Sequence, residues 1–238
     1  MDSIEIITAA KEGDLELVKK LKKGGADINT VNGSGASALI VATEKGHSDI
    51  VRYLADEGAD LNIETKMGGT ALNRAAENGN IELMNYLFEK GVNVGSLALI
   101  VAARNGHLDA VKLLLEKGAD VDFQQRWGHT ALMLAAKNGN SDVVKYLISQ
   151  GANVYLRDRN DDTAMMIATE NDQEDIAIIL QHAGAIKEVK PPKEKPAPIE
   201  VDEIEEIGDD EDEELGDSSD VDDLVSDDAA PDEIDLDD

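Results

Sequence analysis

Residues 118–150 read GADVDFQQRWGHTALMLAAKNGNSDVVKYLISQ, and each part of this stretch favours a particular local structure. Its first glycine follows an apolar helical pattern and suits the left-handed position that ends a helix. The polar residues 125–128 favour a tight turn. Apolar residues then recur at helical spacing in two blocks, which the helix-breaking Asn-Gly pair at 138–139 separates. The stretch therefore predicts a turn followed by two short antiparallel helices, with Ser141 or Asp142 capping the second helix.

The same unit recurs along most of the chain. The glycines that end successive units are separated by 33 residues, except for one interval of 27. These glycines are Gly25, Gly58, Gly91, Gly118, Gly151 and Gly184. Leucines of the buried type recur with the same spacing, as Leu21, Leu54, Leu87, Leu114, Leu147 and Leu180. Recurrence in phase at several positions predicts a stack of similar helix pairs over residues 3–185.

Short sequence motifs also recur in phase. Thr-Ala-Leu occurs at 70–72 and 130–132, Gly-His at 46–47 and 106–107, and Gly-Ala-Asp at 25–27, 58–60 and 118–120. With a period near 33, these motifs resemble the ankyrin repeat. The resemblance implies about six repeats in an all-α solenoid with β-hairpin turns, forming one domain over residues 1–185. It also implies that His47 and His107, which share a repeat position, make structural hydrogen bonds in loops.

One repeat is shorter than the others. Between Gly91 and Leu99 the chain lacks six residues, and the missing residues are those of the hairpin finger. Both helices of this unit are still predicted, so the stack can continue through it. Two interpretations are open. The shortening is a tolerated loop deletion, because connections vary more freely than packed elements, or it is a notch in the row of fingers that admits a partner.

The charge of the chain is acidic and unevenly distributed. Its 51 acidic and 22 basic residues give a net charge of −29, and 22 of the acids lie in residues 199–238, which contain no Lys or Arg. We expect this segment to be a disordered acidic tail, because it can bury too little apolar surface to fold. Residues 186–198, rich in Lys and Pro, are expected to form a semi-stiff linker. The acidic balance argues against direct nucleic-acid binding and favours basic protein partners.

Sequence signals of enzymes, metal sites and membrane proteins do not appear. The chain has no cysteine, and its four histidines lie tens of residues apart, so no zinc-ligand spacing is present. There is also no nucleophile elbow and no phosphate-binding Lys motif. We therefore expect no catalytic, cofactor-binding or metal-binding residues, and a protein that is not an enzyme. Without a signal peptide or a long apolar run, we expect no membrane partner and an intracellular monomer, in the cytoplasm, the nucleus or both.

The resemblance to ankyrin repeats implies a candidate binding surface. In such proteins, the finger tips and the exposed ends of the inner helices form a concave surface that binds proteins. The corresponding finger-tip residues here are Lys66, Met67, Arg126, Trp127, His129, Arg159 and Asn160. The corresponding inner-helix residues are Arg104, Asn105, Lys137 and Asn138. Trp127 is either a solvent-facing anchor for a partner, a role that Trp often has in interfaces, or it packs on the neighbouring finger.

Three functions fit these observations. The first is an adaptor or scaffold that holds a protein partner on the concave repeat surface. The second is a chaperone-like shield for a basic protein, such as a ribosomal protein or a histone, with the tail screening positive charge. The third is a regulatory subunit of an enzyme, since the sequence has no reactive constellation of its own. Binding through the tail would be recognised by its loss at high ionic strength.

Overall fold

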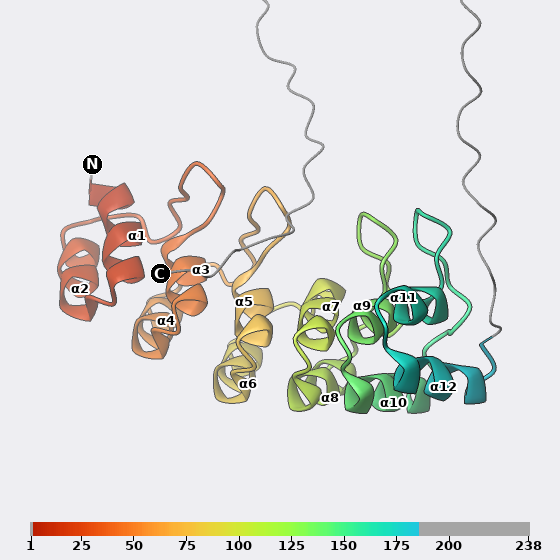
Figure 1. The fold of residues 1–238 in the computed structure, drawn as a ribbon. Helices are drawn as coiled ribbons and strands as arrows, with labels where there is room; N and C mark the ends of the chain where they lie inside the picture. The colour runs from red at the N-terminus through yellow and green to blue at the C-terminus, as the bar shows by residue number, and fades with distance from the viewer. Residues whose placement is uncertain (1, 186–238) are drawn as a thin grey trace, which may run out of the picture. The chain divides into compact units, whose positions relative to one another are not determined.

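The computed structural model describes residues 2–185, and the predicted linker and acidic tail, residues 186–198 and 199–238, lie outside this part of the chain. The described residues form twelve helices, which pair into helix-turn-helix units that stack side by side (Figure 1). The first helices of the units are α1 (Asp2–Glu12), α3 (Ala38–Glu44), α5 (Ala71–Glu77), α7 (Ser96–Arg104), α9 (Ala131–Lys137) and α11 (Ala164–Glu170). The second helices are α2 (Leu15–Lys23), α4 (Ser48–Asp56), α6 (Ile81–Glu89), α8 (Leu108–Glu116), α10 (Ser141–Ser149) and α12 (Glu174–His182). The prediction of an all-α solenoid of paired helices is confirmed.

Finger-like loops precede α3, α5, α9 and α11 and project to the same side of the stack (Figure 1). Two of them contain isolated antiparallel bridges, between Val31 and Ser37 and between Arg157 and Thr163. No strand forms in residues 2–185, so the predicted β-hairpin turns are loops with at most single bridges rather than paired strands. The α7 helix has no such finger, and a short link joins it to α6 at the place where the sequence lacks six residues (Figure 1).

The recurring apolar positions form a continuous core. The recurring leucines of the last five units are fully buried, at Leu54, Leu87, Leu114, Leu147 and Leu180. Leu21 is only partly buried, because α2 is the second helix of the first unit and packs against a neighbouring unit on one side only. Alanines of the inner helices are also fully buried, at Ala42, Ala75, Ala102, Ala135 and Ala168. These small side chains let neighbouring inner helices pack closely, and apolar burial stabilises the stack by about 25 cal/mol per Å².

Hydroxyl side chains cap four of the inner helices. Each accepts a hydrogen bond from the backbone N–H three residues later, and the four are Ser37, Thr70, Thr130 and Thr163. In the shortened unit the corresponding residue is Leu97, which cannot form this bond. There α7 begins at Ser96, with Gly95 in the N-cap position and no side-chain cap. Leu97 therefore differs in chemistry from the residues at its position in the other units.

Two histidines hold the turn between the helices of a unit against the preceding unit. His47 Nε2 lies 3.2 Å from the carbonyl oxygen of Lys11, and His107 Nε2 lies 2.9 Å from that of Glu77. Each ring thus satisfies a carbonyl at the end of a neighbouring inner helix, where carbonyls lack partners within the helix. The structural role expected for both histidines is confirmed.

Asn140 occupies the corresponding position before α10. Its side-chain amide donates to the carbonyl oxygens of Ala103 at 2.9 Å and Arg104 at 2.8 Å. It is also the N-cap residue of α10, which begins at Ser141. The caps expected at Ser141 and Asp142 are therefore wrong, because both residues already lie inside the helix.

A polar cluster joins the outer helices α4 and α6. Lys90 Nζ lies 2.6 Å from Asp56 Oδ1, and the hydroxyl of Tyr86 donates to the same carboxylate at 2.8 Å. Hydrogen bonds from Lys90 and Tyr86 lower the pKa of the Asp56 carboxyl. Burial, together with the nearby Asp56 carboxylate, raises the pKa of the Tyr86 phenol. Because the cluster is on the solvent side of the stack, we expect it to align α4 with α6 rather than to contribute a large part of the stability.

The close contact beneath His107 leads to a stability prediction. Gly79 has a φ of 62°, and a Cβ atom there would lie 2.7 Å from His107 Nδ1. Gly91 has a φ of 85° and no atom within 4 Å of such a Cβ. Both changes to Ala are expected to cost about 1–2 kcal/mol for the left-handed backbone, and Gly79→Ala a further 1–3 kcal/mol or so for overpacking. Urea unfolding of the two variants tests this, and equal losses of stability would contradict it.

Candidate functional site

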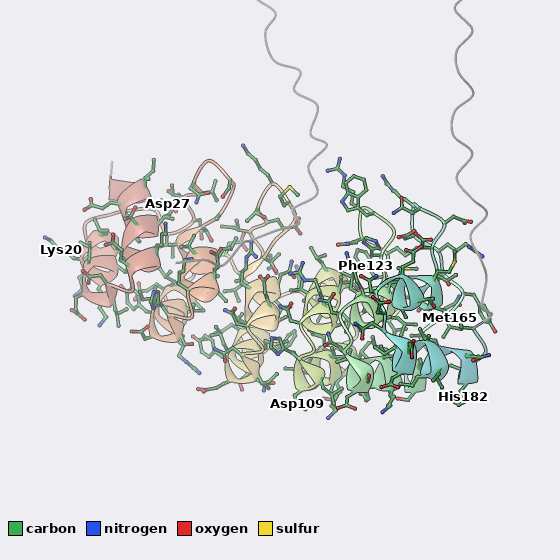
Figure 2. The ribbon with its side chains drawn as sticks, in the orientation of Figure 1. Lys20, Asp27, Asp109, Phe123, Met165 and His182 are labelled. Atoms are coloured by element: carbon green, nitrogen blue, oxygen red, sulfur yellow. The ribbon has the colours of Figure 1, made fainter. Side chains whose placement is uncertain are left out.

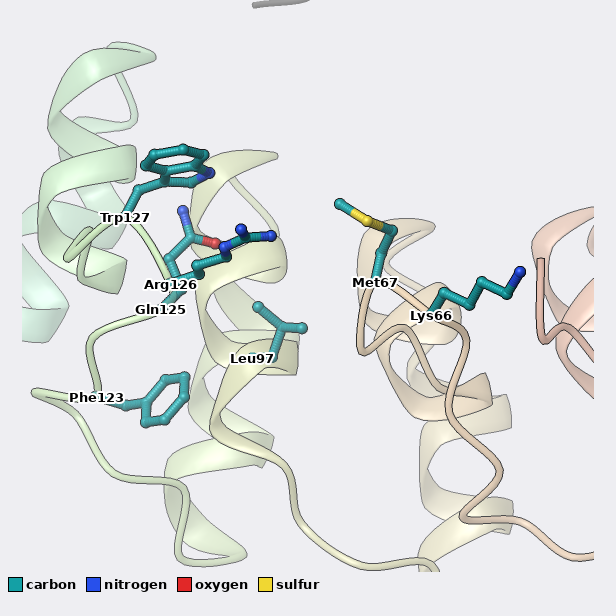
Figure 3. Close-up of a pocket in the computed structure, with 7 residues that line it drawn as sticks. All are labelled: Lys66, Met67, Leu97, Phe123, Gln125, Arg126 and Trp127. Atoms are coloured by element: carbon teal, nitrogen blue, oxygen red, sulfur yellow. The ribbon is translucent and has the colours of Figure 1, made fainter. Parts of the chain in front are cut away.

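A pocket of about 330 Å³ lies where the row of fingers is interrupted. Two fingers and the start of α7 contribute its walls, as Figure 3 shows. Lys66 and Met67 come from the finger before α5, and Leu97 comes from the first turn of α7. The finger before α9 contributes Phe123, Gln125, Arg126 and Trp127. We call this site the notch pocket; residues from three successive units line it.

Apolar side chains dominate the notch pocket. Met67 is 84% exposed, Trp127 is 57% exposed and Phe123 is 37% exposed. Leu97 is partly buried between them, as seen in Figure 3. Single exposed apolar residues are common on protein surfaces, but several gathered around one hollow indicate a binding site. Among the described residues, the other large exposed apolar side chains are Ile4, Val31, Tyr155 and Ile178, and none of them lines this pocket.

The charged residues of the notch pocket are both basic. Lys66 and Arg126 line it, and no carboxylate of the described residues 2–185 does. The Arg126 guanidinium lies 5.6 Å from the centroid of the Trp127 ring, a cation–π distance. On the next finger, the Arg159 guanidinium lies 5.9 Å from the same ring. The pocket therefore combines an apolar surface with a positive rim, although the chain as a whole is acidic.

The structure supports parts of both interpretations of Trp127. More than half of its side chain is exposed, as an anchor for a partner requires. Its neighbour on the next finger, Arg159, lies over the indole ring, and the Arg159 N–H donates to the Trp127 carbonyl oxygen at 3.1 Å. The residue thus contacts the adjacent finger on one side and faces the notch pocket on the other.

The fingers on each side of the notch pocket are joined in pairs. The Lys66 N–H donates to the carbonyl oxygen of Ser34 at 3.0 Å, which connects the fingers before α3 and α5. The Gln124 side chain donates at 2.8 Å to the carbonyl oxygen of Arg157 and so connects the fingers before α9 and α11. In residues 2–185, no hydrogen bond between backbone groups joins the first pair of fingers to the second. The pocket lies between two braced pairs.

Stacking continues without interruption below the missing finger. In full-length units, a side-chain oxygen accepts from a backbone N–H of the next unit, as Asn62 does from Asn93 at 2.9 Å. Gly95 replaces this acceptor in the shortened unit. Ser96 Oγ takes over and accepts from the Asp120 N–H at 3.1 Å. Ser96 therefore preserves the hydrogen bond between the two units at the base of the missing finger. The deletion removes only the projecting part of the unit.

The inner-helix residues of the predicted surface mainly join neighbouring units. The side-chain amides of Asn105 and Asn138 donate at 3.0 Å to the carbonyl oxygens of Glu77 and Arg104, respectively. The Arg104 guanidinium also forms an ion pair with the Glu77 carboxylate at 3.1 Å. Lys137 is exposed at the last residue of α9. None of these four candidate residues lines the notch pocket.

The other finger-tip candidates lie on the far side of Trp127. His129 Nε2 is 3.1 Å from the buried Asp158 carboxylate, so this histidine connects two fingers. Arg159 and Asn160 are exposed on the finger before α11. Arg159 also lines a shallow polar hollow of about 390 Å³ together with Arg126. The structure thus brings four of the predicted residues together in the notch pocket, namely Lys66, Met67, Arg126 and Trp127.

Sequence reasoning missed three residues of the notch pocket, which are Leu97, Phe123 and Gln125. Leu97 could have been found, because it is a leucine at a position that carries Ser or Thr in four other units. Phe123 has no comparable signal, because apolar residues also occur at the corresponding position of two other units, as Ile63 and Leu156. Figure 2 places Phe123 near α7, at the base of its finger rather than at the tip.

Within 2–185, no group of three or more His, Asp or Glu side chains could hold a metal ion. In the same part of the chain, every helix is too short or too polar to cross a membrane.

Comparisons with known proteins agree with this architecture. The family described as "Ankyrin repeats (3 copies)" matches residues 6–98 and 99–190. The ankyrin repeat domain of human ASB11 is 26% identical, with a TM-score of 0.69, over 80% of this chain and 88% of that one. An ankyrin repeat domain of Acinetobacter baumannii is 27% identical, with a TM-score of 0.65, over 76% of this chain and 98% of that one.

A third similar structure comes from a complex. It is that of a predatory endopeptidase of Bdellovibrio bacteriovorus with an immunity protein, with 29% identity and a TM-score of 0.66. The similarity covers 74% of this chain and 96% of that one. No curated protein matches the sequence. The two matched segments span most of the chain, and the helix pairs stack as the repeat motifs predict, so the chain belongs to the ankyrin-repeat family.

Proposed function

We propose that this protein is an adaptor or scaffold that binds a protein partner through its fingers and the adjacent ends of its inner helices. The observation that carries the proposal is the notch pocket, where apolar side chains are exposed beside two cations that have no ion-pair partner among residues 2–185. Exposed apolar surface of this kind is costly in water unless another molecule covers it. The partner is recognised on the side of the stack to which the fingers project.

The family supports this proposal in general terms. Ankyrin repeats are general protein–protein interaction modules and are typically not catalytic. One of the similar structures was determined in a complex that contains an immunity protein. By analogy, this protein would act by holding another polypeptide rather than by chemistry of its own, and a role as regulatory subunit of an enzyme is one form of such binding.

A second candidate function rests on the acidic segment. Residues 199–238 carry 22 Asp and Glu and no basic residue, which suits a chaperone-like shield for a basic protein such as a ribosomal protein or histone. The adaptor would contact its partner through the repeats, whereas the shield would contact it through residues 199–238. We further propose an intracellular monomer, in the cytoplasm, the nucleus or both, that does not bind nucleic acid directly.

Site-specific photo-crosslinking tests the adaptor function. A photo-reactive residue at Met67, on a finger tip, is expected to capture a defined partner in cells that make the protein. The control is the same residue at Asp109, which Figure 2 shows on α8, on the side away from the fingers, and which is exposed. Crosslinks from the finger tip should persist when residues 199–238 are removed. Equal capture from both sites would contradict the proposal, and loss on removing the tail would favour the shield.

A further inference from the structure

We propose that the notch pocket binds an acidic peptide segment of a partner protein and takes up one bulky apolar side chain of that segment. The proposal rests on the binding function proposed above and assigns the chemistry of the ligand. Three independent features of the pocket carry it: the residue at its floor, the charge around it and the bracing of its walls.

The floor of the notch pocket has an unusual residue for its position. Four other inner helices carry Ser or Thr there, and each hydroxyl accepts a backbone hydrogen bond. In the shortened unit, Leu97 takes this position, and the helix has no side-chain cap. Without a finger above it, Leu97 faces the space between Met67 and Trp127 (Figure 3). A helix end without a cap and a partly exposed leucine both raise the free energy of the unbound protein. An apolar ligand group would cover the leucine and remove its contact with water.

The charge around the notch pocket selects an acidic ligand. Among residues 2–185, Lys66 and Arg126 line it, no carboxylate does, and neither cation has an ion-pair partner. Elsewhere in the repeats, several basic side chains are paired, as Arg52 is with Glu82 at 2.7 Å and Lys90 is with Asp56 at 2.6 Å. An acidic segment would supply the carboxylates that this pocket lacks. A basic segment would be repelled by both cations.

The walls of the notch pocket are held in place before any ligand arrives. Backbone and side-chain hydrogen bonds join the fingers in pairs on each side, through Lys66 with Ser34 and through Gln124 with Arg157. The base of the shortened unit is joined to the next one through Ser96 and Asp120. A preformed site loses less conformational entropy on binding than a flexible one. The pocket can therefore accept a short segment with little rearrangement.

The size and surroundings of the notch pocket favour a peptide over other acidic ligands. Its volume of about 330 Å³ is near the lower end of the range for ligand pockets, which suits a side chain better than a large cofactor. A nucleic-acid strand would also be acidic and could stack on Trp127. However, it needs a basic track along its backbone, and among residues 2–185 only two cations, Lys66 and Arg126, line the pocket. We therefore assign the pocket to a polypeptide.

Fluorescence titration of the full chain tests the proposal, because Trp127 is its only tryptophan. The probes are seven-residue peptides with a central Leu or Gly, flanked by Glu or by Lys on both sides. The Glu-flanked Leu peptide should bind and change the emission of Trp127. Replacing the central Leu by Gly, or the flanking Glu by Lys, is expected to weaken binding by about tenfold or more, since each change removes apolar burial or charge attraction.

A pair of variants distinguishes binding in the notch pocket from nonspecific binding to exposed apolar residues. Leu97→Thr restores the residue type of the other units. It should lower the affinity for the Glu-flanked Leu peptide by about fivefold or more, because the apolar contact is lost. Ile178→Thr removes an exposed apolar residue on α12, outside the pocket, and should leave binding unchanged. Thermal unfolding of both variants verifies that the repeats remain folded.

Several results would overturn the assignment. They are the absence of binding, equal binding of Lys-flanked peptides, no effect of Leu97→Thr, or tighter binding of a ten-nucleotide single strand than of the acidic peptide. Binding that appears only after residues 199–238 are removed would assign the pocket to an acidic segment of this chain instead of a partner. If crosslinking from Met67 captures a protein while no acidic peptide binds, the adaptor function stands and the ligand chemistry proposed here is wrong.

Discussion

Replacement of Leu114 by Ala is expected to lower the free energy of unfolding by about 2–5 kcal/mol, the range for truncating a fully buried leucine. Leu114 lies on α8 and has no exposed surface. Its helix packs against the outer helices on both sides as well as against α7. A cavity at this position therefore weakens one unit and its contacts with two neighbours. Urea unfolding followed by circular dichroism measures the loss.

The matched control uses the same repeat position in the first unit. Leu21 on α2 is only partly buried, and α2 packs against one neighbouring unit. Leu21→Ala should cost distinctly less than Leu114→Ala, because the truncated side chain is already partly in water and fewer neighbours lose contacts. Equal destabilisation of the two variants would show that the repeats do not differ in burial as the structure indicates.

Restoring the missing finger is expected to abolish binding of the Glu-flanked Leu peptide, with an affinity loss of about a hundredfold or more, or roughly 3 kcal/mol. The insert is a copy of Glu64–Gly69 placed between Ser96 and Leu97, which gives the fourth unit the length of the others. The new finger would fill the space between Met67 and Trp127. It contains no tryptophan, so the emission of Trp127 still reports on the pocket.

A second insertion controls for length. The same six residues placed after Asp172, in the exposed turn between α11 and α12 and outside the pocket, should leave peptide binding unchanged. Unfolding measurements on both insertions show whether the repeats tolerate them. If the restored finger leaves the affinity as it was, the shortened repeat is a tolerated loop deletion, and the notch has no role in recognition.

The repeat architecture could be predicted from the amino-acid sequence alone. The period near 33, the recurring Gly-Ala-Asp and Thr-Ala-Leu motifs and the spacing of Leu54, Leu87 and Leu114 predicted both the helix pairs and the buried positions. These signals are local, because a helix end, a turn or an apolar face depends on a few neighbouring residues. The position of the missing finger was also visible, since one interval between glycines is six residues short. Local patterns were less exact at helix ends, where Asn140 rather than Ser141 or Asp142 is the cap.

Which candidate residues meet depends on how the units stack in three dimensions. Met67, Leu97 and Trp127 lie about 30 residues apart in sequence and come together because three units stack in register. The same stacking directs the side chains of Asn105 and Asn138 into hydrogen bonds with neighbouring units, although their repeat positions suggested a binding surface. Whether a side chain faces a partner or an adjacent repeat depends on the spacing and orientation of the units. That geometry is absent from any single repeat, because each unit buries its apolar face only against the next one.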